Sequence, residues 1–369
     1  MNRGQLPRVK MINNQYPVGR SQAGLSLVEL MVALALSTTL ILGIFTVYFD
    51  SSQTSRVSSA LARIQESGRI AIDIMARDMR MVGYQGCADP NNITMNIIAE
   101  NPPTGDFFST TLRGWEVENS NWASGTEFDD TTIEADAIVG SDVIAIQRGE
   151  TVNVQLTGNM DNTNANIQVG GPEVSTFDQN DIVLLSDCEN ADLFRISSNP
   201  DSETWAHAKG VNTDNRLGQA YSDSASVMRF SSTVYYVADT GRTDSRGNPI
   251  RALYRGTNNL INDSSPDFQV EELVEGVESL QIEYGEQIGT NSFRYRPADD
   301  VGQMTRVVAL RMGLLISDAE PVRDTVDTGT YALPSETITS TSGGGTVTHP
   351  EDQRLRRVFS NTVALRNRD

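Results

Sequence analysis

The chain carries one long apolar run near its N-terminus, from Leu25 to Phe49, and this run limits what the rest of the chain can become. As a helix rising about 1.5 Å per residue, it would be roughly 37 Å long. That length is sufficient to cross a hydrocarbon core of about 30 Å. Glu29 is the one charge inside the run, and an ionisable residue in a membrane segment usually marks function. The sequence therefore predicts a membrane helix with a functional acid near its start.

The helical pattern continues beyond the apolar run. No proline interrupts the chain from Leu25 to Val82, and Gly83 is a suitable stop, since glycine often ends helices. Residues 25–49 are therefore predicted to be the transmembrane half of one long helix, and residues 50–83 its amphipathic half. One stripe of this second half carries apolar and small residues every three or four positions, namely Val57, Leu61, Ile64, Gly68, Ala71, Met75, Met79 and Val82.

Charge predicts the orientation of the helix and excludes one class of partner. Residues 1–24 contain four bases, which should hold the N-terminus in the cytoplasm. The net charge of −19 would become −23 without these four bases. Such acidity argues against direct binding of nucleic acid, which needs a basic surface.

Residues 84–369 are predicted to form a β-rich domain. We expect a short helix at Glu271–Val277 and a flexible exposed loop at residues 334–350, where Ser and Gly are frequent. Runs rich in Val, Ile, Leu and Tyr, bounded by turn residues, predict strands at Asp142–Arg148, Val152–Leu156, Asp181–Ser186, Leu193–Ser197, Val227–Ala238, Ile250–Arg255, Leu280–Tyr284, Val307–Ile316 and Val358–Leu365.

The chain has two cysteines, Cys87 and Cys188. An even count in an oxidising compartment favours one disulfide between them. Two buried free thiols remain the alternative.

No constellation for catalysis is visible in the sequence. The only two histidines, His207 and His349, lie in loop-like surroundings, and the common catalytic and phosphate-binding motifs do not occur. We therefore expect no catalytic residues, no enzyme activity and no cofactor.

One polar stretch partly matches the spacing of a calcium-binding loop. Asn162, Asn164, Asn166 and Glu173 fall at some ligand positions of an EF-hand. However, Ile167 stands where that loop needs glycine, and the first ligand is not acidic. A polar hairpin loop is the preferred interpretation, and no metal site is expected.

The sequence Gly-Leu-Ser-Leu-Val-Glu, residues 24–29, closely resembles the processing site of type IV prepilins. In that family a membrane peptidase cuts after the glycine and methylates the new N-terminus. The resemblance implies that residues 1–24 are a cleaved leader, that the cut falls between Gly24 and Leu25, and that Leu25 is N-methylated. It also implies that Glu29 serves subunit assembly by pairing with the terminal amine of a neighbour. The family usually has Phe where this chain has Leu25.

An ordinary signal anchor or signal peptide is the alternative for the same stretch, since both need only a basic start and an apolar run. A signal peptide fits poorly, because no small-residue cleavage site follows the run. An ordinary anchor needs neither Gly24 nor Glu29.

Three later stretches resemble the PilW family of minor pilins: Arg77–Cys87, Leu185–Cys188 with Phe194 following, and Asp352–Asn367. The resemblance implies an α+β, pilin-like fold, in which a long N-terminal helix packs on a β-rich, mainly antiparallel C-terminal domain. It implies a minor pilin that helps to initiate type IV pilus assembly in a priming complex at the tip. Twitching motility, adhesion and DNA uptake would depend on it indirectly.

The implied partners are other minor pilins and the major pilin, the prepilin peptidase, the inner-membrane assembly platform and a tip adhesin. The implied location is the inner membrane, with the head in the periplasm, and then the pilus. Two alternatives remain open: a J-like minor pseudopilin of a type II secretion system, and a signal-anchored periplasmic binding module.

Overall fold

The computed structural model of the chain contains two compact units, Met1–Ser55 and Arg56–Asp369, which are described separately. We call the second unit the head. Leu25, Asn162, Asn367 and residues 1–23 lie outside the described residues. The structure describes residues 24, 26–87, 95–100, 111–123, 131–158, 160–161, 164–258, 268–290 and 292–366.

Helix α1 spans Leu27–Met79 and confirms the prediction of one long helix. It contains no proline, which would remove a backbone hydrogen bond from its interior. The chain then turns, and Gly83 adopts a φ of 71°, a left-handed value that costs glycine little. The amide of Gly83 donates to the carbonyl of Gln147 at 2.9 Å, so the end of the helix is tied to a strand of the head.

The larger sheet of the head has ten strands and is organised around the long strand β8. β8 pairs antiparallel with β3, β5 and β9, while the pair β1–β6 is parallel. The path β1-β6-β5-β8-β3-β4-β7 is extended by β2 on β3, by β9 on β8 and by β10 on β9. The bounds are β1 Met95–Ile97, β2 Leu112–Glu116, β3 Asp142–Leu156, β4 Asn166–Gly170, β5 Ile182–Ser186, β6 Ala191–Arg195, β7 Thr204–Ala206, β8 Ser226–Thr243, β9 Pro249–Asn258 and β10 Gln269–Glu275.

A second sheet of four antiparallel strands has the order β12-β11-β13-β17. Gly276, with a φ of 86°, carries the chain from β10 in the first sheet to β11 in the second. Its amide donates to Arg251 O at 2.8 Å, and its carbonyl accepts from Ser317 N at 2.8 Å, so this glycine joins the two sheets. The bounds are β11 Val277–Gly289, β12 Ser292–Arg296, β13 Val307–Ser317 and β17 Arg356–Ala364.

The structure corrects the expectation for residues 334–350, which are not a plain exposed loop. They contribute β15 Thr337–Ser340 and β16 Thr348–His349, which form a small sheet with β14 Tyr331–Ala332. The side chains of Ile338 and His349 are buried. The remaining short elements are α3 Thr131–Asp136 and the 3-10 turns η1 Val174–Thr176, η2 Ala298–Asp300, η3 Met304–Arg306 and η4 Thr341–Gly343.

Two further expectations change. Glu271–Val277 is not a helix, because residues up to Glu275 belong to β10 and pair with β9. The two runs Asp142–Arg148 and Val152–Leu156 form the single strand β3. The remaining predicted runs each overlap a strand, and the α+β architecture with a mainly antiparallel head is as expected.

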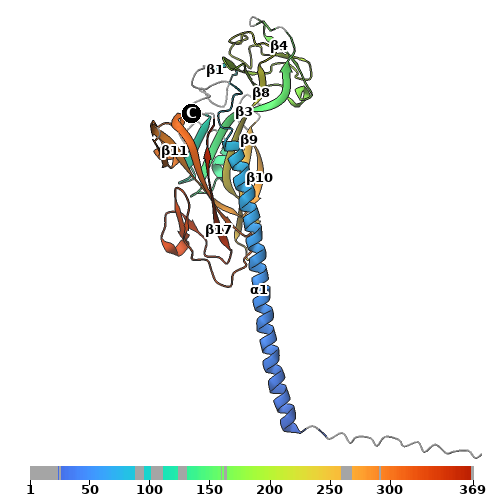
Figure 1. The fold of residues 1–369 in the computed structure, drawn as a ribbon, viewed down its shortest axis with the longest axis vertical. Coiled ribbons are helices and arrows are strands. Elements are labelled where there is room, and N and C mark those ends of the chain that lie inside the picture. Colours follow the sequence, from blue (N-terminus) through green and yellow to red (C-terminus); the bar gives the residue numbers. More distant parts are fainter. Residues whose placement is uncertain are drawn as a thin grey trace, which may run out of the picture. The chain divides into compact units, whose positions relative to one another are not determined.

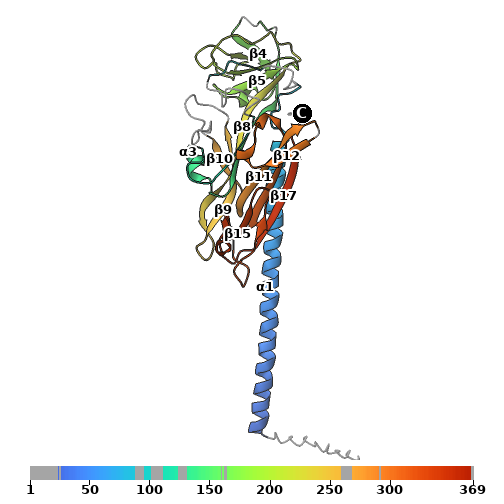
Figure 2. The same cartoon turned by 90° about the vertical axis from the view of Figure 1, so that its left-hand side faces the viewer.

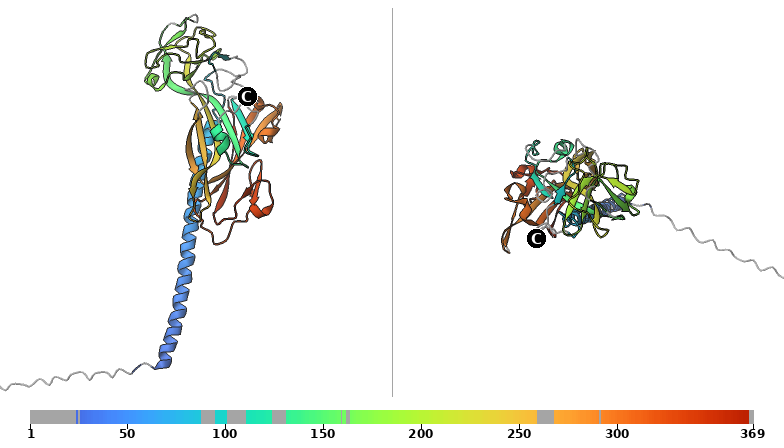
Figure 3. Two further views of the ribbon diagram at one scale, coloured as in Figure 1. Left: turned by 180° about the vertical axis from the view of Figure 1, so that it is seen from behind. Right: turned by 90° about the horizontal axis from the view of Figure 1, so that it is seen from above.

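The main core of the head lies where the C-terminal part of α1 meets both large sheets (Figures 1 and 3). It joins helix residues such as Met75 to β3, β8 and β9 of the first sheet and to β11, β13 and β17 of the second. A second core cluster, around Phe177 and Trp205, fills the part of the head that contains β4 and β5. Figure 2 shows β4 and β5 at one end of the head and β15 at the other.

Candidate functional site

The first turn of α1 contains a reciprocal pair of hydrogen bonds between Ser26 and Glu29. The amide of Ser26 donates to Glu29 Oε2 at 3.2 Å, and the amide of Glu29 donates to Ser26 Oγ at 3.2 Å. This is a capping box, in which a serine at the helix start and a glutamate three positions later each satisfy a free backbone amide. Sequence reasoning missed this role of Ser26, although the Ser-x-x-Glu spacing is its usual signal.

Of the two residues at the predicted cleavage site, the structure describes Gly24. Gly24 is exposed, and nothing lies within 4 Å of a Cβ built on it. Leu25 lies outside the described residues. Glu29 is exposed in the first helical turn, where the positive end of the helix dipole favours a carboxylate. The negative charge of Glu29 is therefore stabilised within its own helix.

Three threonine hydroxyls in the apolar part of α1 bond within the helix itself. Its large apolar side chains are exposed from Leu27 to Phe49. The hydroxyls of Thr38, Thr39 and Thr46 donate to backbone carbonyls of the same helix at 2.7, 2.9 and 2.9 Å. Such internal bonds are required in lipid, where no water replaces them.

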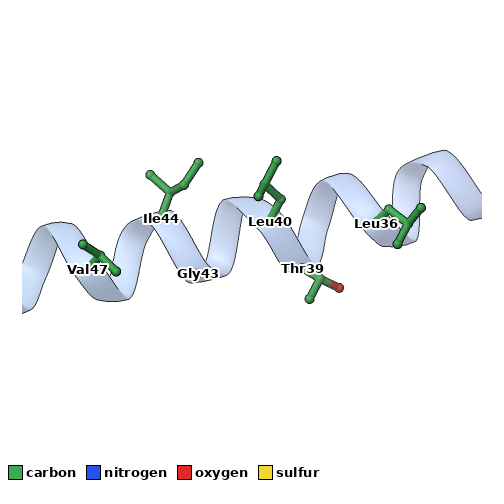
Figure 4. Close-up of a pocket in the computed structure, with 6 residues that line it drawn as sticks. All are labelled: Leu36, Thr39, Leu40, Gly43, Ile44 and Val47. Carbon is green, nitrogen blue, oxygen red and sulfur yellow. The ribbon is translucent and has the colours of Figure 1, made fainter.

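Among the described residues, α1 is the helix long and apolar enough to cross a membrane, a test that an N-terminal signal sequence also passes. One face of this segment has a shallow apolar hollow centred on Gly43 (Figure 4). Because glycine has no side chain, another helix can approach such a position closely. The hollow is lined by Leu36, Thr39, Leu40, Gly43, Ile44 and Val47.

The second half of α1 is fixed to the rest of the head by packing and by ion pairs of Arg63 and Asp78. Ile64, Ala71 and Met75 of the predicted apolar stripe are buried in the main core. Outside that core, the guanidinium of Arg63 lies 2.9 Å from the carboxylate of Asp318. The amphipathic pattern therefore identified the face of the helix that contacts the head.

Asp78, near the end of α1, is a buried charge that sequence reasoning missed. Its carboxylate accepts from Arg148 Nη1 at 2.8 Å and from the Tyr235 hydroxyl at 2.5 Å, and Arg255 lies 3.9 Å away. A negative charge near a helix C-terminus is unfavourable, so these partners are needed to offset it. Burial raises the pKa of Tyr235, and the neighbouring carboxylate of Asp78 raises it further.

A disulfide joins the exit of the helix to the first sheet. Cys87 follows the turn after α1, and Cys188 lies between β5 and β6, with their Cα atoms 4.7 Å apart. Cys188 adopts a left-handed φ of 76°. The pairing predicted from the cysteine count is confirmed, and the alternative of two free thiols is wrong.

Two family models match the chain. The prokaryotic N-terminal methylation motif matches residues 19–45, and the model for type IV pilus-assembly protein W, PilW, matches residues 234–367. The chain is therefore similar to type IV pilins at its N-terminus and to the PilW family over residues 234–367. No curated protein and no solved structure matches it.

The last part of the segment that matches the PilW model, near residue 367, contains many buried charged side chains. Arg356, at the start of β17, is fully buried and contacts Glu278, Asp327 and Asp352 at 2.7, 3.2 and 2.8 Å. These ion pairs connect β17 with β11 and with the segment between β13 and β17. Buried charges need such partners, so this part of the head depends on a matched set of residues.

The histidines of the head are both buried. His207 lies in a loop directly after β7, as expected, whereas His349 belongs to the short strand β16. The two ring nitrogens of His207 have no hydrogen-bond partner, and His349 Nε2 contacts Gly329 O at 2.9 Å from within β16. No group of three or more His, Cys, Asp or Glu side chains suited to a metal ion occurs among the described residues. Members of the PilW family are structural components of pili rather than typical enzymes.

The stretch with partial EF-hand spacing forms part of a hairpin. Asn166 begins β4, which pairs antiparallel with the end of β3. Glu173 Oε2 accepts from the amide of Asn153 at 2.9 Å, so this carboxylate supports the hairpin from outside. Asn164 lies in the connection, and Asn162 lies outside the described residues.

Proposed function

We propose that this pilin is a minor pilin that helps to initiate type IV pilus assembly in a priming complex at the pilus tip. The observation that carries the proposal is the presence, in one chain, of a prepilin-type N-terminus and a PilW-type head. The protein acts by association rather than by chemistry. Its apolar helix packs with helices of other minor pilins and the major pilin, and the head selects its neighbours.

Processing precedes assembly in this proposal. The prepilin peptidase removes residues 1–24 by a cut between Gly24 and Leu25, and Leu25 becomes the methylated N-terminus. The match to the methylation motif, which includes these residues, supports this step. Residues 25–49 remain in the inner membrane, residues 50–83 continue the helix, and residues 84–369 form the periplasmic part that meets the assembly platform and a tip adhesin.

Glu29 is the proposed assembly residue. Its carboxylate is exposed and uses Oε2 for the Ser26 amide. A carboxylate accepts several hydrogen bonds, so it has capacity for the terminal amine of a neighbouring subunit as well. Within lipid, losing one member of such a pair leaves an uncompensated charge, which is costly.

Two variants separate the assembly role of Glu29 from its role in the capping box. Ser26→Ala removes the hydroxyl of the box and keeps the carboxylate, whereas Glu29→Ala removes the carboxylate. We expect Glu29→Ala to lose co-purification with other minor pilins and to reduce the number of surface pili, while Ser26→Ala keeps both near wild type. Wild-type pilus numbers in Glu29→Ala would contradict the assembly role. Normal pili but failed protein secretion on deleting the gene would favour the type II pseudopilin instead.

A further inference from the structure

Strand β12 leaves one border of the second sheet open. It is the end strand in the order β12-β11-β13-β17, and within the described part of the chain it pairs with β11 alone (Figure 2). The backbone N–H and C=O groups on the outer side of an end strand are not used by its own sheet, so they can pair with another strand. Several peptide-binding proteins use such a border to add an extended segment of a partner to the sheet.

The side chains of β12 form an aromatic side and a basic side, because successive residues of a strand point to opposite faces. Phe293 and Tyr295 share the aromatic side, where their ring centroids are 5.5 Å apart in an edge-to-face arrangement. Phe293 is 53% exposed, and Ile288, near the end of β11, is 52% exposed. Arg294 and Arg296 share the opposite side. The border therefore offers apolar surface on one face and positive charge on the other.

Tyr295 is held in place by the neighbouring strands. The guanidinium of Arg311, in β13, lies 3.9 Å from the centre of its ring, and Arg311 also pairs with Glu283 of β11 at 2.9 Å. Gly285 is directly opposite Tyr295 in the ladder, and a Cβ built on this glycine would lie 3.1 Å from the ring. The aromatic side is therefore ordered before a partner binds, which lowers the entropic cost of binding.

The two arginines of β12 have unused capacity for a carboxylate. Arg294 is exposed, and neither a hydrogen bond nor an ion pair joins it to any described residue. Arg296 uses Nη1 for the backbone carbonyl of Asp300, at 3.0 Å, and forms no ion pair with a described carboxylate. A guanidinium holds a carboxylate through two parallel hydrogen bonds. In a chain with a net charge of −19, two such arginines at an open sheet border indicate an acidic partner from outside the chain.

Two other occupants fit this border less well. Antiparallel pairing of β12 with β12 of a second copy would place basic side beside basic side, and like charges in opposite positions destabilise a sheet. Nucleic acid needs an extended basic surface, whereas β12 contributes two arginines to an acidic chain. An extended segment with acids at every second position fits both sides at once. Its acids reach the arginines while its apolar residues cover Phe293 and Tyr295.

We propose that β12 binds an extended segment of a partner protein in which acidic and apolar residues alternate, and that this segment is added to the second sheet beside β12. The proposal does not rest on the processing or assembly of the N-terminal helix, because β12 belongs to the head.

The test uses the full-length protein in detergent micelles and the capped peptide acetyl-Thr-Glu-Val-Glu-Val-Glu-Thr-amide, with binding measured by calorimetry. One control peptide has glutamine in place of every glutamate. The other carries methyl groups on two adjacent backbone nitrogens at its centre, which removes a donor from each edge of the strand. We expect the acidic peptide to bind with a dissociation constant on the order of 0.1 mM. Each control peptide should bind at least about tenfold more weakly, because it lacks either the charges or the backbone donors.

Three variants locate the binding. Arg294→Gln and Phe293→Ala are each expected to weaken the acidic peptide about three- to fivefold, the range for an exposed ion pair or one cross-strand contact. Arg216→Gln removes the same charge from an exposed position between β7 and β8 and should leave binding unchanged. Circular dichroism checks that each variant is folded.

Absence of binding by the acidic peptide would overturn the proposal. Equal binding of the methylated peptide would do so as well, because it excludes strand addition, and equal weakening in Arg216→Gln would indicate non-specific attraction. If a short single-stranded oligonucleotide bound in a manner that depends on Arg294, and the peptide did not bind, the border would be a nucleic-acid site instead. If Arg294→Gln dissociated a wild-type dimer, and the peptide did not bind, the border would be a contact between copies.

Discussion

Gly68 of α1 lies directly against the aromatic ring of Phe359 in β17, and a Cβ built on Gly68 would stand 2.6 Å from three carbons of that ring. The contact joins the helix to the edge strand of the second sheet. Gly68 lies between Ile64 and Ala71, which are both in the main core, so the absence of a side chain at this position lets the helix approach the sheet.

Gly68→Ala is therefore expected to destabilise the head, although alanine is the better helix former. The gain in helix propensity is about 1 kcal/mol, whereas overpacking costs typically about 1–3 kcal/mol. We expect a net loss of about 1 kcal/mol, measured as a lower free energy of unfolding in denaturant. Gly43→Ala is the matched control, because nothing lies within 4 Å of a Cβ at that position of the same helix. A stabilised Gly68→Ala variant would show that Phe359 moves aside freely.

Reducing the disulfide should lower the stability of the head substantially. Cys87 and Cys188 are 101 residues apart in sequence. A bridge closing a loop of this length contributes up to about 4.7 kcal/mol in the chain-entropy model, and strain lowers that value. We expect the free energy of unfolding to fall by several kcal/mol when dithiothreitol is added. The Cys87→Ser/Cys188→Ser variant should have the same low free energy of unfolding with and without the reductant. If dithiothreitol left the free energy of unfolding of the wild type unchanged, this prediction would be contradicted.

His207 should make the head less stable at mildly acidic pH. Burial lowers the pKa of His207 from 6.5 to about 4, consistent with two ring nitrogens that have no partner. Between these values the unfolded chain binds a proton that the folded chain does not, so stability falls as the pH drops from 6.5 to 4. The full effect is up to about 3 kcal/mol.

The difference in unfolding free energy between wild type and His207→Leu isolates this effect. Asp181 acts in the opposite sense, because burial raises its pKa from 3.8 to about 6 and stability therefore rises as the pH falls through this range. Asp181 is present in both proteins, so its contribution cancels in the difference. A difference that stays constant between pH 7 and pH 4 would show that His207 is protonated without penalty in the folded head.

The long helix was predictable because its signals are local. The spacing of Ile64, Ala71 and Met75 identifies the buried face from the sequence alone. The predicted stop at Gly83 lies in the turn that follows Met79, where the helix ends. The cysteine pair was predictable because only one pairing is possible within a single chain. The Ser26–Glu29 capping box has an equally local signal, the spacing of a serine and a glutamate three positions later.

The parts that were not predictable depend on distant partners. Residues Gln269–Glu275 have acids and apolar residues in an order compatible with a helix, but they pair with β9 and form a strand. Residues 334–350 are polar and glycine-rich, yet Ile338 packs with Leu315 and Leu333 in a small core cluster. The acids Glu116 and Asp142 are 26 positions apart and become neighbours only when β2 pairs with β3.

Mass spectrometry of the N-terminus of the protein from cells that make pili tests the central claim most directly. The account predicts a mature chain that begins at Leu25 with a methylated amine, and a Gly24→Val variant that keeps residues 1–24. A wild-type chain that begins at any other residue, or that retains its leader, would contradict the account.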